Sequence, residues 1–180
     1  NFTDPDSRIM QRAGGGFDPA YNAQTAVDDT AHIIVAAELS NNAADTQQLV
    51  PMLQAVKNNT GELPRQGLAD AGYRSEDNFE RLAAVPIELV VALGREGKSQ
   101  AQVDPQTHPH TAAMATKLQT DEGRTAYRRR KWIAEPPNGW IKSVLGFRQF
   151  SLRGLHRVQA EFKLVCMALN LRRLGSLKVA

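Results

Sequence analysis

The pattern of residues 66–93 places the strongest constraint on the fold of this 180-residue chain. A short β-type segment, Gln66 to Ala69, is followed by a helical segment and then by the uninterrupted apolar run Ile87 to Leu93. Ser75 is a suitable N-cap for that helix, and Pro86 ends it. Because a strand, a helix and a strand in this order pair in parallel through a right-handed crossover, the pattern predicts an α/β fold.

Two β-rich segments precede this pattern, Tyr21 to Val27 and His32 to Leu39, with a tight connection that begins at Asp28. They predict two antiparallel strands, and the adjacent apolar residues of the second strand indicate burial on both faces. Residues 1–20 contain two prolines and three consecutive glycines, so they predict a loop or the end of a hairpin.

Helical periodicity appears in three further places. Apolar spacing predicts a helix capped at Asp45, although Pro51 indicates that the helix starts a few residues later or bends. Asp121 opens a basic helical segment, and residues 154–174 predict a buried core helix. We therefore expect three segments: an α/β core over residues 1–93, a polar surface connection over 94–120, and a basic helical region over 121–180.

The charge of the chain changes sign along its length. Residues 1–120 contain 9 Lys and Arg against 15 Asp and Glu, a net charge of −6. Residues 121–180 contain 13 against 4, a net charge of +9. This asymmetry suggests a basic region that follows a polyanion, but Lys and Arg that merely solvate two long helices explain it equally well.

Composition excludes several classes of protein. The longest uncharged apolar run, Leu89 to Leu93, is far shorter than the roughly 20 residues of a membrane-spanning helix. The single cysteine, Cys166, cannot form an internal disulfide or a thiolate zinc site, and it favours a reducing, cytoplasmic location. No signal peptide is evident, and we interpret the start at Asn1 as a cut from a longer chain.

Two carboxylates are candidates for a chemical role. Asp70 ends a predicted strand before a glycine turn, where ligand-facing side chains stand in an α/β sheet. The alternative is a turn residue that caps its own backbone. Glu135 follows the basic run Arg128 to Lys131 and precedes Lys142, so it is either a functional carboxylate or a surface ion-pair partner.

Other catalytic chemistries lack support in the sequence. The four histidines have neither cysteine partners nor the spacing of a zinc site. There is no nucleophilic serine motif, and Cys166 lies among apolar residues of the predicted last helix. The glycine run 14–16 lacks the strand before it and the Lys-Ser/Thr after it that a phosphate-binding loop requires.

Several short motifs, in a fixed order, cover most of the chain outside residues 94–120. They are Asn1–Arg8, Tyr21–Asp28, Leu68–Tyr73, Arg129–Lys131, Glu135–Pro136, Gly139–Lys142, Gly146–Arg148, Leu152–Leu155 and Ala168–Leu171. Together they resemble the catalytic domain of bacterial insertion-sequence transposases of the DDE type. The resemblance implies an RNase H-like mixed sheet flanked by helices, whose first strand precedes Asn1 and is missing from this chain.

In such transposases three carboxylates hold two Mg²⁺ or Mn²⁺ ions, which activate the attacking oxygen and stabilise the leaving 3′-oxygen. The resemblance places the second carboxylate on Asp70 and the third on Glu135. It places the first on the strand that precedes Asn1. Asp28, at a strand end, is the nearest substitute for the first carboxylate in this chain. Asp45 is another candidate, but its predicted role as a helix cap accounts for it without a catalytic role.

The resemblance also includes a Tyr-x2-Arg-x3-Glu-x6-Lys signature around the third carboxylate. Glu135 and Lys142 match its second half, whereas Tyr127 and Arg130 keep their mutual spacing but lie one residue too far from Glu135. Lys131 stands at the signature's arginine position instead.

Two prolines follow Glu135, and we expect the helix to break or restart at that point.

Basic residues near the carboxylate are expected to contact DNA phosphates and so to position the DNA rather than read its bases. These residues are Lys142, Arg128, Arg129, Arg130, Lys131, Arg148 and Arg153.

The resemblance therefore implies a transposase catalytic-domain fragment that cuts transposon ends and joins them to target DNA with Mg²⁺. We expect it to act on double-stranded DNA as a homo-oligomer, in the bacterial cytoplasm at the nucleoid. Two alternatives remain. One is a non-catalytic DNA-binding or assembly fragment of a decayed element, and the other is an RNase H-like nuclease that hydrolyses DNA without strand transfer.

Overall fold

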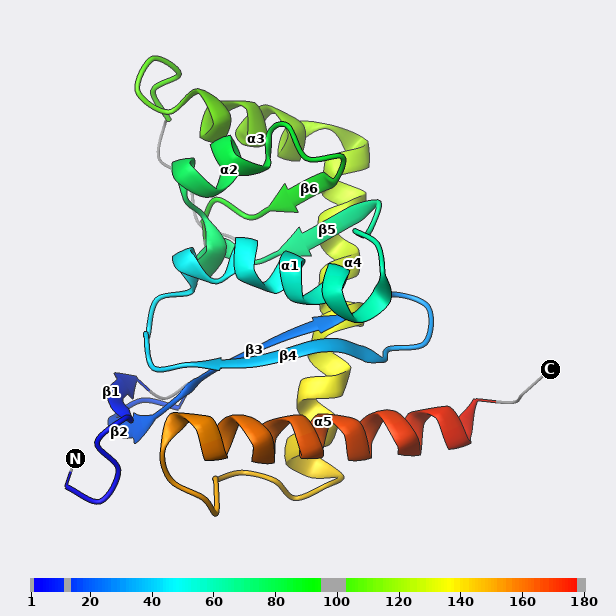
Figure 1. The fold of residues 1–180 in the computed structure, drawn as a ribbon. Coiled ribbons are helices and arrows are strands. Elements are labelled where there is room, and N and C mark those ends of the chain that lie inside the picture. Colours follow the sequence, from blue (N-terminus) through cyan, green and yellow to red (C-terminus); the bar gives the residue numbers. More distant parts are fainter. Residues whose placement is uncertain (1, 12–13, 95–102, 178–180) are drawn as a thin grey trace. The chain divides into compact units, whose positions relative to one another are not determined.

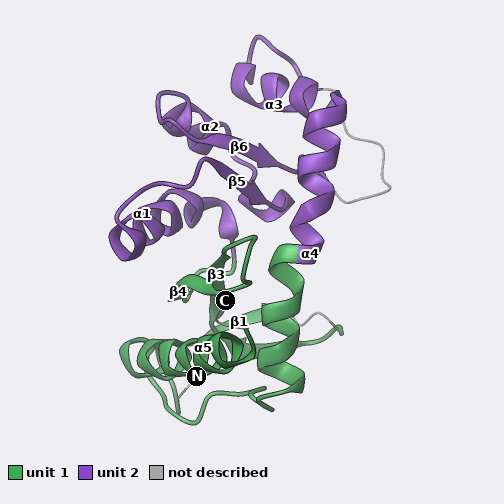
Figure 2. Cartoon of the chain, turned by 90° about the vertical axis from the view of Figure 1, so that its right-hand side faces the viewer, with its two compact units in different colours: residues 1–43, 133–180 green, residues 44–132 purple. Residues whose placement is uncertain are grey.

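The computed structural model describes residues 2–11, 14–94 and 103–177 (Figure 1). These residues form a mixed α/β structure with three two-stranded sheets and five α-helices. The chain divides into two compact units, each with its own hydrophobic core (Figure 2). Unit 1 contains residues 1–43 and 133–180, and unit 2 contains residues 44–132. None of the described helices is long and apolar enough to span a membrane.

Unit 1 begins with two antiparallel strand pairs. Strand β1 (Arg8–Gln11) pairs with β2 (Phe17–Ala20), so residues 1–20 contain a strand hairpin and not merely a loop. Strand β3 (Asn22–Val27) pairs with β4 (Ile34–Ser40), which confirms the predicted antiparallel pair.

The last helix satisfies backbone groups of β4 with two side-chain amides. Helix α5 (Leu155–Ser176) carries Asn170, whose Oδ1 accepts from the Ile34 N–H at 2.9 Å and whose Nδ2 donates to the Ile34 carbonyl at 2.8 Å. Gln159 makes the same kind of pair with the Leu39 N–H and the Ala37 carbonyl. Because buried backbone groups need partners, these amides fix the helix against the strand.

The core of unit 1 lies between α5 and β4, and the prediction of a buried last helix is confirmed. One face of α5 buries Val158, Phe162, Cys166 and Leu169 against Ile34, Ala37 and Leu39 of β4. Burial raises the pKa of the Cys166 thiol to about 12, so this cysteine acts as a small apolar core residue.

Two acidic residues connect the N-terminal segment to the start of α5. Asp4 is buried, with 8% of its surface exposed, and accepts from the Tyr21 hydroxyl at 2.8 Å and from the Gly154 N–H at 3.2 Å. Asp6 accepts from the Leu155 N–H at 2.9 Å. Both carboxylates therefore satisfy backbone donors at the positive end of the helix dipole.

We predict that Asp4→Asn lowers stability at neutral pH and that the loss disappears in acid. Burial alone would raise the pKa of Asp4, but the hydrogen bonds from Tyr21 and from backbone N–H groups outweigh it and hold this pKa below its ordinary value. A carboxylate with a lowered pKa stabilises the fold above its ordinary pKa, and this contribution is lost as the pH falls through the lowered value.

Urea unfolding as a function of pH tests this, with the exposed Glu62→Gln as the control. The difference in the free energy of unfolding between the wild-type protein and Asp4→Asn should disappear as the pH falls through the lowered pKa of Asp4. A gap that stays constant with pH would contradict the role of the ionised carboxylate.

Unit 2 contains the parallel strand pair that the sequence predicts. Strand β5 (Gln66–Ala69), helix α2 (Glu76–Leu82) and strand β6 (Glu88–Val91) follow one another, and β5 pairs with β6 in parallel. The core packs side chains of α1 (Leu49–Thr60), α2 and β6 around the fully buried Val91. The parallel arrangement places the C-terminal ends of both strands at the same edge.

Helix α1 starts a few residues after Asp45, as Pro51 indicates. A 3-10 turn, η1 (Asp45–Gln47), comes first, and α1 begins at Leu49, which places Pro51 in the first turn, where a proline is tolerated. The predicted helix cap at Asp45 is wrong, because Asp45 is the first residue of η1 and Gln48 is the N-cap of α1. Neither Gln48 nor Ala44, the N-cap of η1, makes a side-chain cap bond.

Part of the expected surface connection is a packed helix. Helix α3 (Pro109–Gln119) buries Thr111 and Met114, so the prediction of an irregular polar connection is wrong for these residues; residues 95–102 lie outside the described part. The Glu76 carboxylate accepts from the backbone N–H groups of His110 and Thr111 at 2.8 and 2.9 Å. A tertiary cap therefore starts this helix, which its weak apolar periodicity does not predict.

Helix α4 (Asp121–Ser143) runs without interruption through Pro136 and Pro137, so the predicted helix break is wrong. A proline lacks the N–H that would bond the carbonyl four residues earlier, but its φ angle is compatible with a helix. Pro137 is fully buried and Ile141 belongs to the core of unit 1. Their burial offsets the lost hydrogen bonds, and the division between the two units falls within α4, after Trp132.

We predict that Gln159→Leu destabilises unit 1 by about 1–3 kcal/mol, because it leaves the Leu39 N–H and the Ala37 carbonyl without their partners. The same substitution at the exposed Gln119 is the control and should be nearly neutral. Denaturant unfolding measures both. Equal stability of the two variants would show that the helix amides do not hold β4.

Candidate functional site

Asp70 lies where the sequence places it, directly after β5. It is the N-cap of the 3-10 turn η2 (Ala71–Tyr73), and its Oδ1 accepts from the Gly72 N–H at 2.9 Å. The turn-cap interpretation of Asp70 is therefore correct for one carboxylate oxygen. It does not exclude a ligand role, because a carboxylate offers about four acceptor positions.

A second carboxylate meets Asp70 at the glycine of this turn. A Cβ atom at Gly72 would lie 2.6 Å from Asp45 Oδ2 and 3.0 Å from Asp70 Oδ1, so both side chains approach the same small volume. Burial, followed by the nearby charges of Asp45 and Asp70, raises the pKa of the Tyr73 hydroxyl. Two carboxylates that approach the same volume form a negatively charged site that attracts cations.

The two carboxylates of unit 2 suit a hard cation, but they do not make a complete set of metal ligands. Carboxylate oxygens are the ligands that Mg²⁺ prefers, and Asp45 and Asp70 supply them at the end of β5. Across residues 2–11, 14–94 and 103–177, no group of three or more His, Cys, Asp or Glu side chains is arranged to hold a metal ion. Glu135 belongs to unit 1, whereas Asp45 and Asp70 belong to unit 2.

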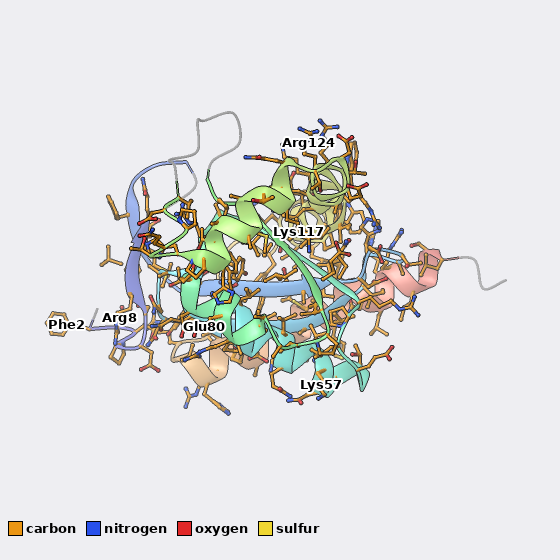
Figure 3. All side chains as sticks on the ribbon, turned by 90° about the horizontal axis from the view of Figure 1, so that it is seen from above. Phe2, Arg8, Lys57, Glu80, Lys117 and Arg124 are labelled. Carbon is orange, nitrogen blue, oxygen red and sulfur yellow. The ribbon has the colours of Figure 1, made fainter. Side chains whose placement is uncertain are left out.

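Helix α4 presents Glu135 on one exposed stripe. Residues on the stripe recur at intervals of three or four, so they share one side of the helix. Arg124 lies near the start of the helix (Figure 3). The stripe consists of Arg124, Arg128, Trp132, Glu135, Gly139 and Lys142, and all six are exposed. Glu135 and Lys142, which match the second half of the signature, therefore lie on the same side of the helix. The stripe also contains Arg128 and Trp132, and the sequence analysis did not single out Trp132.

Tyr127 and Arg130, the candidates for the first half of the signature, are not part of this stripe. The Arg130 guanidinium stacks over the Tyr127 ring at 5.6 Å from its centroid. Arg130 is half-buried, and its buried Nε makes no hydrogen bond in the described structure. Tyr127 and Arg130 therefore pack on each other, whereas Arg128, Arg129 and Lys131 are exposed to solvent.

The loop between α4 and α5 presents two more of the predicted DNA-binding residues, Arg148 and Arg153, both exposed. Glu161 of α5 holds this loop by accepting from the Ser151 and Leu152 N–H groups at 2.9 Å each. Burial would raise the pKa of Glu161, but these bonds outweigh it and lower the pKa. No local sequence signal indicates this role, because donors and acceptor are nine or more residues apart.

Asp28 has a structural role in the β3–β4 turn. Its carboxylate accepts from the Thr30 N–H at 3.0 Å and from the Ala31 N–H at 2.8 Å, and also from the Ile33 N–H. The turn includes His32 in the left-handed region, at φ 58°, which is uncommon for a residue other than glycine. Three backbone bonds to one carboxylate stabilise this conformation.

We predict that Gly72→Ala moves the Asp45 and Asp70 carboxylates apart with little loss of stability, because the added methyl group would overlap Asp45 Oδ2, which is the end of a side chain that can shift. Gly14→Ala is the control, since no atom lies within 4 Å of its Cβ position. Denaturant unfolding and the crystal structure of the variant measure the two effects. Unchanged carboxylate positions would contradict the close approach.

A family profile described as "Transposase DDE domain" matches residues 4–171 and so covers both units. Searches of curated proteins and of solved structures gave no significant match.

Proposed function

The chain belongs to the transposase DDE domain family, and we propose that it carries part of a metal-dependent site for DNA strand cleavage and strand transfer. The observation that carries the proposal is the approach of Asp70 to a second carboxylate at the end of the parallel strand β5. The ends of parallel strands are where α/β proteins bind ligands. The exposed Glu135 and Lys142 on α4 supply the rest of the family pattern.

We propose an RNase H-like arrangement for the complete domain. The order of elements supports it: the antiparallel pair β3–β4, then α1, then β5, α2 and β6 with β5 and β6 in parallel. In this proposal the first catalytic aspartate comes from a strand that precedes Asn1. Asp28 is not assigned that role, since three backbone N–H groups already use its carboxylate.

Asp70 and Glu135 are the proposed ligands of divalent ions, Mg²⁺ or Mn²⁺. When bound, the ions would activate the attacking oxygen and stabilise the leaving 3′-oxygen of the DNA. The protein's own contribution is orientation. The Gly72 N–H holds one oxygen of Asp70, and α4 places Lys142 two turns after Glu135. In this proposal Lys142 would contact a DNA phosphate.

We predict that, in a protein with the strand that precedes Asn1 restored, Asp70→Asn and Glu135→Gln each lower DNA cleavage on the order of 10³-fold, because each removes metal-dependent stabilisation worth several kcal/mol. Binding of Mn²⁺, followed by electron paramagnetic resonance, should weaken in both variants. Asp77→Asn and Glu122→Gln replace exposed carboxylates of α2 and α4 and are the controls. Unchanged Mn²⁺ affinity in both test variants would exclude the catalytic proposal and leave a DNA-binding fragment.

We predict that replacing Arg128, Arg129 and Arg130 by Gln weakens DNA binding and reduces the slope of log affinity against log salt. Each phosphate contact that is removed lowers the number of counterions released on binding by about one, so the slope should become smaller by about 1 per contact. Lys57→Gln, in the last turn of α1 (Figure 3), is the control. An unchanged slope would remove α4 from the DNA interface.

Strand transfer separates the proposal from the nuclease alternative. A transposase joins the freed 3′-end to a supercoiled target plasmid, whereas a nuclease gives only cut products.

A further inference from the structure

Helix α5 has an exposed apolar seam on the side opposite its core face. The seam consists of Leu164, Met167, Leu171 and Leu174, with 60, 51, 62 and 51% of their surfaces exposed. The buried residues of α5, which include Val158 and Phe162, pack against β4 within unit 1 (Figure 1). Single exposed apolar residues are common, but a contiguous row of large ones marks a contact surface.

The spacing of the seam is that of a contact between two helices. Its members follow one another at intervals of three, four and three residues, and the exposed Ala160 extends the row by four residues toward the N-terminus. This alternation is the 3.5-residue period of a coiled-coil seam, whereas a helix that packs on a sheet buries a wider face. The surface therefore fits another helix.

Helix α5 is already ordered before any partner binds. The side-chain amides of Gln159 and Asn170 bond backbone groups of β4 and so hold the helix in place. A free helix with so short a seam would be marginal in water. Because α5 is fixed by its own unit, association costs little ordering entropy, and a short seam is sufficient.

The charges beside the seam are compatible with a second copy of the same helix. Lys163 is the charged neighbour on one side, and its Nζ lies 2.8 Å from Glu38 Oε1 of the same chain. Toward the C-terminus the neighbours Ala168, Asn170 and Gly175 carry no charge. Two copies of this surface therefore meet without strong like-charge repulsion, and neither requires a strongly charged partner.

The area of the seam predicts a weak complex. A half-exposed Leu or Met side chain offers roughly 100 Å², so two copies of the seam would bury about 800 Å² before their neighbours are counted. Interfaces below about 1,200 Å² belong to weak, transient complexes. We therefore expect a reversible dimer that forms with rising protein concentration.

We propose that α5 pairs with α5 of a second copy of this chain in an antiparallel, two-fold symmetric contact. Leu164 then meets Leu174 of the second copy, and Met167 meets its Leu171. A parallel pairing would instead place Arg157, three residues before Ala160 on the same seam, opposite its own counterpart. The antiparallel pairing places Lys163 near the C-terminal end of the other helix, where the helix dipole favours a cation.

Sedimentation velocity over a series of protein concentrations tests the contact, without DNA or metal. The wild-type chain should change reversibly from monomer to dimer. Leu171→Glu should raise the dissociation constant on the order of tenfold or more, because the two-fold contact buries the new charge twice. Val144→Glu is the matched control: Val144 is an apolar residue of unit 1 outside α5, 47% exposed, and its replacement should leave the dissociation constant unchanged.

Disulfide formation tests the orientation. Met167→Cys and Leu171→Cys are prepared separately, one of them with a terminal tag, and are oxidised alone and as a mixture. The native thiol of Cys166 is buried, with 3% of its surface exposed, so the wild-type chain is the control and should not cross-link. The antiparallel contact predicts that the mixed disulfide forms faster than the disulfide of either variant alone.

Three results would overturn the proposal. They are a wild-type chain that stays monomeric up to its solubility limit, a dimer that Leu171→Glu leaves intact, and faster cross-linking in each cysteine variant alone than in the mixture. Circular dichroism of Leu171→Glu checks that the substitution leaves the fold unchanged. All three results leave the metal-site proposal standing, because Asp70→Asn and Glu135→Gln test that site separately.

Discussion

The continuity of helix α4 through Pro136 and Pro137 is the constraint on which the candidate site depends. Each proline in a helix interior costs about 3 kcal/mol or more, so a continuous helix requires compensation. The complete burial of Pro137 and the packing of Ile141 in the core of unit 1 provide it. As a result Glu135 keeps its helical register with Arg128 before the prolines and with Lys142 after them. A break at Glu135 would have separated these side chains.

The sequence predicts the elements whose stability comes from their own apolar pattern. Alternating or continuous apolar residues identify β3, β4, β5 and β6, and helical spacing identifies α5, because each element buries an apolar face that its own sequence pattern shows. The position of Asp70 follows from the end of β5 and the glycine turn after it. These predictions need only the period of the pattern and the turn chemistry.

The rest depends on contacts between distant residues. Helix α3 starts where Glu76, more than thirty residues earlier, accepts from its first N–H groups, and its own sequence is polar. Asp45 lies 25 residues before Asp70, and only the packing of η1 beside η2 brings their carboxylates to Gly72. Local rules explained Asp45 as a helix cap and Pro136 as a helix break. Asp45 instead begins the turn η1, and α4 continues through Pro136 beside the buried Pro137 and Ile141.

The central claim is that Asp70 and Glu135 hold the same divalent ions on DNA. Fe²⁺ substitutes for Mg²⁺ or Mn²⁺ at oxygen-ligand sites, and with ascorbate it generates hydroxyl radicals that cut the protein backbone near the bound ion. Mass spectrometry of the protein–DNA complex after this treatment locates the cuts. Cuts beside both Asp70 and Glu135 that excess Mg²⁺ suppresses are the predicted result. Cuts at only one of these positions, or at neither, would contradict a shared metal site.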